Sequence, residues 1–404
     1  MSENQYIVLR SKGGFLPTAD NLGVARGPLG VPAGAGPRAA AAPEEIEINE
    51  VKLTKSERDD LRRDPRTLAM APPMPLKLIE PMDATDADGP AATAAANTWG
   101  IEAVGAHQSA FDGSGVNVAV LDTGIDLTHP AFAGVNIERK NFTAEGDDDI
   151  HGHGTHCAGT IFGKDVNGTR VGVARNISKA LIGKVLGQGQ GTSANLANAI
   201  QWAVENGANV VSMSLGIDFP GFVEFLVNDQ GLDINPATSI ALEGYRANIN
   251  LFGALTQMIE ARNAFANGCI IVAASGNESE RPTYEIAVAP PAAGNGIISV
   301  GALQQGAGGF SVASFSNTQC NVSAPGVAVS SAALGGGLVS WNGTSMATPH
   351  VSGVAALWAQ KELQQTNRIS GQNTAAKILA LATMNGIKAG QEVEDVGNGI
   401  VQAP

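Results

Sequence analysis

The stretch Val118-Ala119-Val120-Leu121-Asp122-Thr123-Gly124 decides how this sequence is interpreted. Four consecutive apolar residues predict a buried strand, and a carboxylate follows where that strand ends. Ligand sites of open α/β sheets lie at this end of the parallel strands. Asp122 is therefore a candidate functional residue, although an Asp-Thr-Gly sequence after a strand is, taken alone, usually only a turn.

Similar apolar runs alternate with helical patterns from Trp99 onward. Continuous apolar strands separated by helices are typical of a mostly parallel sheet with helices on both faces. We therefore predict an α/β fold class. The predicted strands are residues 116–121, 180–186, 209–213, 269–274 and 297–300, and the predicted helices are residues 194–206, 255–267 and 345–363.

Two further motifs carry residues of catalytic type. His151-Gly-His153-Gly-Thr-His156-Cys157 contains small residues that allow close packing around an imidazole. Asn342-Gly-Thr-Ser345 leads into an apolar helical pattern, which would place the hydroxyl of Ser345 near the positive end of a helix dipole. Taken singly, Ser345 suits a helix cap, but the joint occurrence of the three motifs favours one shared site.

In the order Asp, His, Ser, these motifs resemble the subtilisin-like serine proteases (subtilases), over about residues 99–363. The resemblance implies a three-layer fold with helices flanking the central sheet. It implies that Ser345 is the nucleophile, His153 the general base and then the general acid, and Asp122 the group that orients the imidazole. Asn277, in Ala273-Ala-Ser-Gly-Asn277, would be the oxyanion donor together with the backbone N–H of Ser345.

These residue types suit the chemistry of peptide hydrolysis. A serine hydroxyl is too weak an acid to attack an amide unaided, so it needs a base whose pKa lies near neutrality. A buried carboxylate then holds that imidazole in one tautomer. Donors aimed at the oxyanion stabilise the tetrahedral intermediate.

The resemblance also implies where an extended peptide binds. Ser214, Leu215 and Gly216 would form the strand that pairs with substrate, and Gly189 with Gly191 would form the opposite wall. We place the floor of the pocket for the residue before the cleaved bond near Ala289, which would suit a large apolar side chain.

A metal site is the main alternative for the histidine motif, because three histidines and Cys157 are all zinc ligand types. The family interpretation requires no cofactor. Family members often carry calcium, but Ala131 and Val166 stand at two expected ligand positions, with Asp165 and Asn167 adjacent, so structural calcium is left unassigned.

An insertion of about thirty residues, near 217–251, follows the predicted substrate strand. Its Phe219, Phe222 and Phe225 would line an extended subsite, form a lid, or make a small satellite core, and the sequence leaves these readings open.

The N-terminal residues 1–90 resemble, in position, the family's propeptide, an intramolecular inhibitor and chaperone. We predict a small α+β unit here, with a flexible Gly/Ala/Pro loop at about 24–43 and a helix that begins with a Thr54–Glu57 capping box. Residues 91–98 would be a processing linker before a catalytic domain at 99–404, with self-cleavage within about 82–97. A permanent N-terminal domain is the alternative.

Composition limits partners and location. The net charge of −13 opposes binding to nucleic acid, and no apolar run is long enough to span a membrane. The first residues show no export signal, and three widely spaced cysteines favour a reducing compartment, so we expect a cytoplasmic protein, with release by a non-standard route left open.

The function that these observations favour is a serine endopeptidase made as a self-processing zymogen, acting on peptide or protein substrates. Two alternatives share its residues: a peptide ligase or macrocyclase, in which an amine resolves the acyl-enzyme, and a catalytically silent peptide-binding protein.

Overall fold

The computed structural model describes residues 3–12, 45–83, 96–188, 191–262 and 267–404. Within these residues, eight strands form the main sheet, in the order β14-β13-β12-β10-β6-β8-β7, with β15 paired to β13. Every neighbouring pair is parallel except β13 with β14. The strands are β6 (Asn117–Asp122), β7 (Ile137–Asn141), β8 (Lys179–Lys184), β10 (Val210–Met213), β12 (Ile270–Ala274), β13 (Ile297–Gly306), β14 (Gly309–Val312) and β15 (Val322–Pro325).

Alternate side chains of each central strand enter two different cores. In β6, Val118 and Val120 belong to one buried apolar cluster, whereas Ala119 and Leu121 belong to a second. Because successive side chains of a strand point to opposite faces, this division places one core on each side of the sheet. The predicted three-layer α/β architecture is confirmed, and the five predicted strands are all present.

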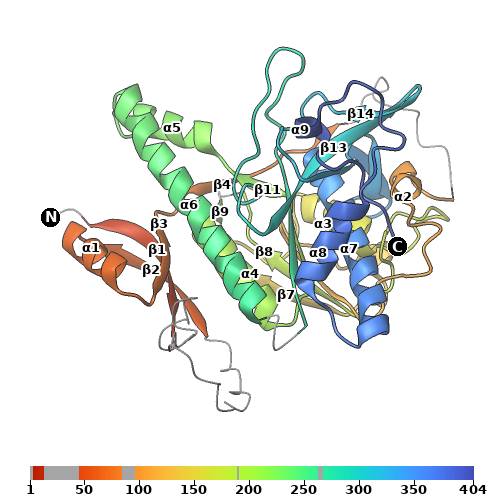
Figure 1. The fold of residues 1–404 in the computed structure, drawn as a ribbon, viewed down its shortest axis with the longest axis horizontal. Helices are drawn as coiled ribbons and strands as arrows, with labels where there is room; N and C mark the ends of the chain where they lie inside the picture. Colours follow the sequence, from red (N-terminus) through yellow and green to blue (C-terminus); the bar gives the residue numbers. More distant parts are fainter. Residues whose placement is uncertain (1–2, 13–44, 84–95, 189–190, 263–266) are drawn as a thin grey trace, which may run out of the picture.

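Helices α3 (His153–Phe162) and α7 (Thr344–Thr366) cover one face of the sheet, and α4 (Ser193–Glu205) and α6 (Ile234–Arg262) cover the other. Figure 1 shows both layers. The shorter helices are α2 (Trp99–Ala103), α8 (Gly371–Leu381), α9 (Val393–Val396) and the 3₁₀ turn η2 (Pro130–Phe132). No helix of the described residues is long and apolar enough to cross a membrane.

The predicted helix at 255–267 begins too late in the chain, and its residues 263–266 lie outside the described ones. Helix α6 begins at Ile234 and runs for 29 residues, so its first half lies inside the insertion. Pro236 fits within the first turn, where its missing N–H has no helical partner to lose. The polar residues that interrupt the apolar pattern before Leu251 concealed this first half.

The insertion folds as helix α5 (Phe219–Asn228) packed against the first half of α6. Leu226, Ala237 and Ala241 are buried between the two helices, with Phe219 and Phe222 packed around them. The satellite-core interpretation of the aromatic residues is therefore the one that the structure supports, although Phe225 is 45% exposed.

The N-terminal unit is an antiparallel three-stranded sheet with one helix. Strand β1 (Asn4–Ser11) lies between β2 (Ile46–Leu53) and β3 (Thr67–Ala71), and helix α1 (Lys55–Arg63) connects the two outer strands. The predicted capping box is present, since Thr54 and Glu57 exchange side-chain-to-backbone hydrogen bonds. The predicted loop at 24–43 lies outside the described residues.

This unit packs on the part of the chain that holds the main sheet, through a shared core. Ile7 and Leu9 of β1 are fully buried in the same cluster as Leu251 and Phe252 of α6. In Figure 1 the unit lies at one end of the molecule, beside α6. Burying an apolar side chain contributes about 1.5–3 kcal/mol, so this contact favours docking.

Candidate active site

Asp122 and His153 form a buried pair. Asp122 ends β6, and one of its carboxylate oxygens, Oδ1, lies 2.7 Å from His153 Nδ1 at the first residue of α3. The same oxygen accepts the Thr123 backbone N–H at 2.7 Å. Both side chains are at most 1% exposed, so the geometry is fixed by surrounding protein.

The loop before His153 is held by a second buried carboxylate, Asp149. It accepts hydrogen bonds from the backbone N–H groups of His151, Gly152 and Thr155 and from the Thr155 hydroxyl. Although burial opposes ionisation, these hydrogen bonds lower the pKa of Asp149. Asp149 therefore satisfies the free N–H groups at the start of α3, which carries His153.

Gly154 allows this helix to approach Asp122. A methyl group built on Gly154 would lie 2.2 Å from the carbonyl oxygen of Gly124. The backbone N–H of Gly154 donates to the Thr123 hydroxyl at 2.9 Å, and that hydroxyl donates to Asp149 at 3.0 Å. The Gly after His153 in the motif is thus required by close packing.

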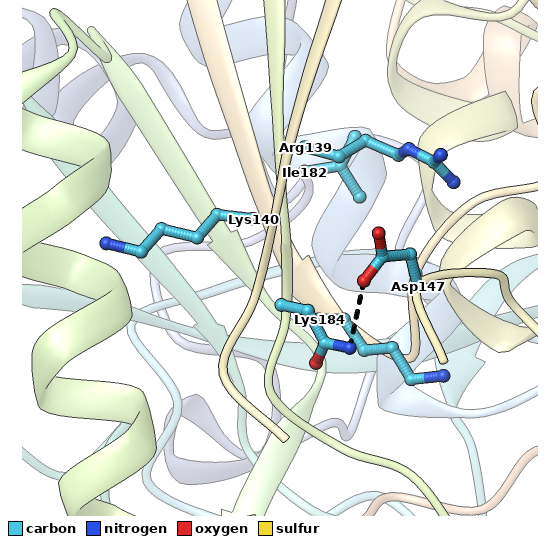
Figure 2. Close-up of a pocket in the computed structure, with 7 residues that line it drawn as sticks. Arg139, Lys140, Asp147, Ile182 and Lys184 are labelled. Carbon is cyan, nitrogen blue, oxygen red and sulfur yellow. Dashed lines mark hydrogen bonds between the residues drawn. The ribbon is translucent and has the colours of Figure 1, made fainter. Parts of the chain in front are cut away.

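A buried lysine fixes the chain just before Asp149. The Nζ of Lys184, at the end of β8, donates to the carbonyl oxygens of Gly146 and Asp148, both at 2.8 Å. Figure 2 shows Lys184 and Asp147 lining a pocket at this point, and Asn141 donates to Asp147 at 3.1 Å. These bonds link the ends of β8 and β7 to the loop that leads to His153.

Ser345 lies in the first turn of α7, and a proline determines the environment of its carbonyl group. Pro349, four residues later, has no N–H to donate to the Ser345 carbonyl. The hydroxyl of Ser214 at 3.2 Å and the thiol of Cys157 at 3.5 Å donate to that carbonyl instead. Cys157 Sγ is also 3.9 Å from His153 Nδ1, so it lies between Ser345 and the Asp122–His153 pair.

Asn277 follows β12 and is oriented by Thr344. The backbone N–H and the hydroxyl of Thr344 both donate to Asn277 Oδ1 at 2.9 Å. The amide nitrogen Nδ2 therefore points the other way, where it donates to the carbonyl oxygen of Glu80 at 3.2 Å. An N–H donor in this position is suited to a developing oxyanion.

Charge sets the proton affinity of His153. Burial alone would lower its pKa, but the Asp122 carboxylate, together with Cys157, outweighs burial and raises the pKa well above the ordinary value. Among the described residues, His153 Nε2 has no hydrogen-bond partner. This nitrogen is the one that a general base needs free.

A segment of the same chain occupies the predicted substrate cleft. Strand β4 (Pro75–Leu78) pairs antiparallel with β11 (Leu215–Ile217) on one side and with β9 (Gly191–Thr192) on the other. Farther along, β5 (Met82–Asp83) pairs with β17 (Leu338–Asn342), which in turn pairs with β16 (Val329–Ala332). The segment thus runs between the two walls that the sequence indicated.

The nucleophile candidate contacts this segment directly. Ser345 Oγ donates to the carbonyl oxygen of Ile79 at 3.0 Å and lies 3.3 Å from that of Ser214. Ser345 and His153 are both fully buried.

The predicted substrate residues are placed unequally. Leu215 pairs with Leu78, Gly216 with Lys77, and Gly191 with Leu76, while Ser214 contacts Ser345. Gly189 lies outside the described residues. A methyl group built on Gly216 would lie 3.8 Å from Ile79 Cδ1 and from Pro290 O, so the Ile79 side chain lies close to Gly216. Ala289 directly precedes Pro290, and its role as the floor of the pocket remains a prediction.

The ligand types in the histidine motif do not converge on a metal. His156 Nε2 lies 3.0 Å from the Val329 carbonyl oxygen, and its ring stacks on Trp341, while His151 lies 3.4 Å from Glu80. Burial lowers the pKa of His156 to about 3. In the described parts of the chain, three or more possible ligands gather only at Asp122, His153 and Cys157, and the first two already bind each other.

The calcium positions are likewise apolar. Ala131 and Val166 are buried in the core, and Asp165 pairs with Arg175 at 2.8 Å. Calcium stays unassigned.

The sequence analysis did not identify four residues that the structure places at or near the site. They are Asp149, Lys184, Thr344 and, in the segment that occupies the cleft, Lys77. Asp149 is one of three consecutive aspartates, and only the fold shows which of them is buried. The Thr beside Ser345 was a signal, because a Thr at a helix start often bonds a neighbouring polar group.

Comparison with known proteins identifies the family. The subtilase family model matches residues 113–399. A thermophilic serine proteinase of Bacillus sp. (strain AK1) is 32% identical over 289 residues, which are 68% of this chain and 62% of that protein. Subtilisin DY of Bacillus licheniformis is 32% identical over 273 residues, 65% of this chain and 85% of that protein.

Among solved structures, the prenylagaramide maturation protease PagA superposes with a TM-score of 0.51 at 25% identity, over 71% of this chain and 90% of that one. The fold is that of the subtilisin-like class of proteins. The chain belongs to the subtilase family.

Proposed function

We propose that this protein is a serine endopeptidase that works through an acyl-enzyme. The observation that supports this most strongly is the peptide strand β4, which lies paired on both sides in the cleft and brings the Ile79 carbonyl oxygen within 3.0 Å of Ser345 Oγ. The thiol of Cys157 connects the Asp122–His153 pair to the same serine, because its Sγ lies 3.9 Å from His153 Nδ1 and 3.5 Å from the Ser345 carbonyl oxygen.

In this proposal each residue has one role. Ser345 Oγ attacks the carbonyl carbon while its proton passes to His153 Nε2, and Asp122 stabilises the resulting imidazolium. Asn277 Nδ2 and the Ser345 N–H donate to the oxyanion. The imidazolium then protonates the leaving amine, the peptide C–N bond breaks, and water hydrolyses the ester that remains.

We further propose that the chain is a zymogen that its N-terminal unit inhibits. The unit is anchored on α6 by Ile7 and Leu9, and the segment that follows the unit contacts Ser345 through the Ile79 carbonyl. The cleavage expected from the sequence at 82–97 stays untested, and residues 84–95 lie outside the described ones. We place the first cut at Ile79–Glu80, because the Ile79 carbonyl is the one that contacts Ser345 Oγ.

This resting geometry must change before the bond breaks. Ser345 Oγ now donates its proton to a carbonyl oxygen, and Asn277 contacts the next carbonyl, that of Glu80. A small shift of the segment together with rotation of the hydroxyl towards His153 would bring the nucleophile and the oxyanion donor to one carbonyl.

The test is intact mass spectrometry of the wild-type chain beside its Ser345→Ala variant. We expect fragments ending at Ile79 and beginning at Glu80 from the wild type, and a full-length product from the variant. Processing that continues in Ser345→Ala would point to another protease and refute self-cleavage. A fragment that ends within 82–97 would show that the cleaved bond lies there and not at Ile79–Glu80, and it would leave the proposed mechanism unchanged.

Ligation is the second candidate, because it would use the same residues, Asp122, His153 and Ser345. The same acyl-enzyme, attacked by an amine, gives a peptide bond and no net hydrolysis. Product masses separate the two reactions, because hydrolysis adds one water to the products and aminolysis does not. A fluorophosphonate probe that fails to label the processed chain at Ser345 would instead favour the silent peptide-binding alternative.

A further inference from the structure

Lys77 of the cleft segment lies between two carboxylates. Its Nζ is 3.0 Å from Glu278 Oε1 and 3.4 Å from Asp218 Oδ1. The three side chains are only 21–32% exposed, so the contact is partly shielded from water. Lys77 is the one basic residue of the sequence Pro75-Leu-Lys-Leu-Ile-Glu80.

The two carboxylates belong to the cleft itself. Asp218 directly follows the substrate strand β11, and Glu278 directly follows Asn277. Burial by itself would lower the pKa of Lys77, but Glu278 and then Asp218 outweigh burial and raise it. The lysine is therefore charged where it meets them.

Other bonds hold each carboxylate in place. Asp218 caps the start of α5 by accepting the Gly221 N–H at 3.2 Å. Glu278 Oε2 accepts a hydrogen bond from Asn317 Nδ2 at 2.7 Å, and Asn317 is fully buried. The acidic pair is thus a built feature of the cleft that persists when Lys77 leaves.

The strand register fixes which substrate residue would meet this pair. Lys77 pairs with Gly216 and stands two residues before Ile79, whose carbonyl contacts Ser345. A peptide that pairs with β11 in the same register places its own residue at this point, because an antiparallel ladder sets the side-chain positions.

We infer that Asp218 and Glu278 form a cation-binding subsite, which makes the cleft prefer Lys or Arg two residues before the residue whose carbonyl faces Ser345. This inference rests on the proposed peptidase function and names part of its substrate class: peptides with a basic residue there and an apolar residue, like Ile79, at the cleavage position. Asp218 lies at the start of the insertion, so the insertion contributes to selectivity through this carboxylate rather than through its aromatic cluster.

The first test compares three fluorogenic peptides on the processed wild-type enzyme: Leu-Lys-Leu-Ile, Leu-norleucine-Leu-Ile and Leu-Glu-Leu-Ile. Two partly exposed ion pairs predict that kcat/KM is about three- to tenfold higher for lysine than for norleucine at low salt, and lowest for glutamate. We expect 0.5 M NaCl to reduce the ratio, because salt screens the charges.

Variants assign the effect to the two carboxylates. In the Asp218→Asn/Glu278→Gln double variant, the lysine-to-norleucine ratio should fall to about one. Asp229→Asn, which removes an exposed carboxylate from the same insertion, should keep the wild-type ratio. Equal kcat/KM values for all three peptides on the wild-type enzyme would overturn the subsite and leave the peptidase function standing.

A second measurement needs no activity. In the full-length Ser345→Ala chain, a double-mutant cycle between Lys77→Met and the carboxylate double variant measures their coupling from thermal unfolding. We expect a coupling of about three- to tenfold in the unfolding equilibrium constant. A coupling of zero overturns the inference even if the enzyme proves inactive, whereas absence of cleavage with intact coupling refutes the proposed function alone.

Discussion

The charge on Asp122 controls the proton affinity of His153. Because the pKa of His153 is raised above its ordinary value, the imidazole is protonated below that raised pKa and cannot accept the proton of Ser345. The rate of self-cleavage should therefore rise with pH until the imidazole is neutral. The stabilisation that the charged pair contributes to folding has the opposite pH dependence. It is complete below the pKa that His153 has in the unfolded chain, and it is lost as pH rises through the raised pKa of His153 in the folded chain.

Asp122→Asn tests this argument. Without the carboxylate, burial dominates and the pKa of His153 should fall, so the NMR-detected titration in the Ser345→Ala chain should move to lower pH. In the chain that keeps Ser345, self-cleavage should slow by about 10⁴-fold, the loss known for this change in a serine-protease triad. Asp148→Asn, at an 86% exposed carboxylate, is the control, and an unmoved titration in Asp122→Asn would contradict the assigned cause.

Asn277→Asp separates the oxyanion donor from the scaffold. The new carboxylate still offers an oxygen to the two Thr344 donors but no longer offers the N–H of Nδ2. We expect self-cleavage to slow by about 10²–10³-fold with little loss of stability. Thr344→Ser keeps both donors and should stay near the wild-type rate. A rate for Asn277→Asp within a few-fold of wild type would remove Asn277 from this role.

The candidate site shows which residues a sequence can predict. Asp122, His153, Asn277 and Ser345 stand in short motifs at strand or helix ends, and the fold gathers those ends. Asp149 and Lys184 are different, because each acts on backbone groups of a loop whose path is set by tertiary packing. No local pattern distinguishes them from exposed charges.

The N-terminal helix α1 depends on its cap. Thr54→Ala removes the oxygen that accepts the Glu57 N–H, which should cost about 1 kcal/mol. In the Ser345→Ala chain we expect hydrogen exchange within Lys55–Arg63 to accelerate about fivefold. Thr54→Ser restores the oxygen and should restore slow exchange, whereas equal exchange in all three chains would show that the cap contributes nothing.

The α5–α6 pair offers a test of the satellite core. Phe222 packs against both this core and the main one. Phe222→Ala should therefore lower the melting temperature, and its loss in the free energy of unfolding should be smaller than the about 3–5 kcal/mol expected for a fully buried phenylalanine. Phe225→Ala, at a more exposed position, should cost less. Peptide preference should be unchanged in both, and a changed preference would restore the aromatic subsite or lid.

Elements were predictable where apolar residues are continuous. The five predicted parallel strands are buried on both faces, so their sequences are largely apolar, and their positions agree with the structure to within a few residues, apart from the longer β13. The sequence did not predict strands β3 and β9 or the first half of α6. These elements are short or half-exposed, and their positions are set by contacts with neighbouring elements. Long-range pairing, such as β4 between β9 and β11, needs the folded molecule.

Over the whole molecule, the N-terminal unit and the catalytic part share one core. Leu9→Ala in the Ser345→Ala chain should weaken docking by about 2–5 kcal/mol, because a fully buried leucine leaves a cavity. Calorimetry should then show the N-terminal unit melting earlier than the remainder. Glu50→Gln, on the exposed strand β2, is the control, and an unchanged melting profile in Leu9→Ala would argue against the shared core.

The two contacts of the N-terminal unit have a further consequence for activation. Both the Leu9 face and strand β4 belong to the part of the chain before Glu80, so the fragment cut at Ile79–Glu80 would still bind at two places. Each contact holds the other at a high effective concentration, and this avidity delays escape. Breaking the bond and releasing the enzyme would thus be separate events, and the onset of activity towards other peptides would lag behind the cut.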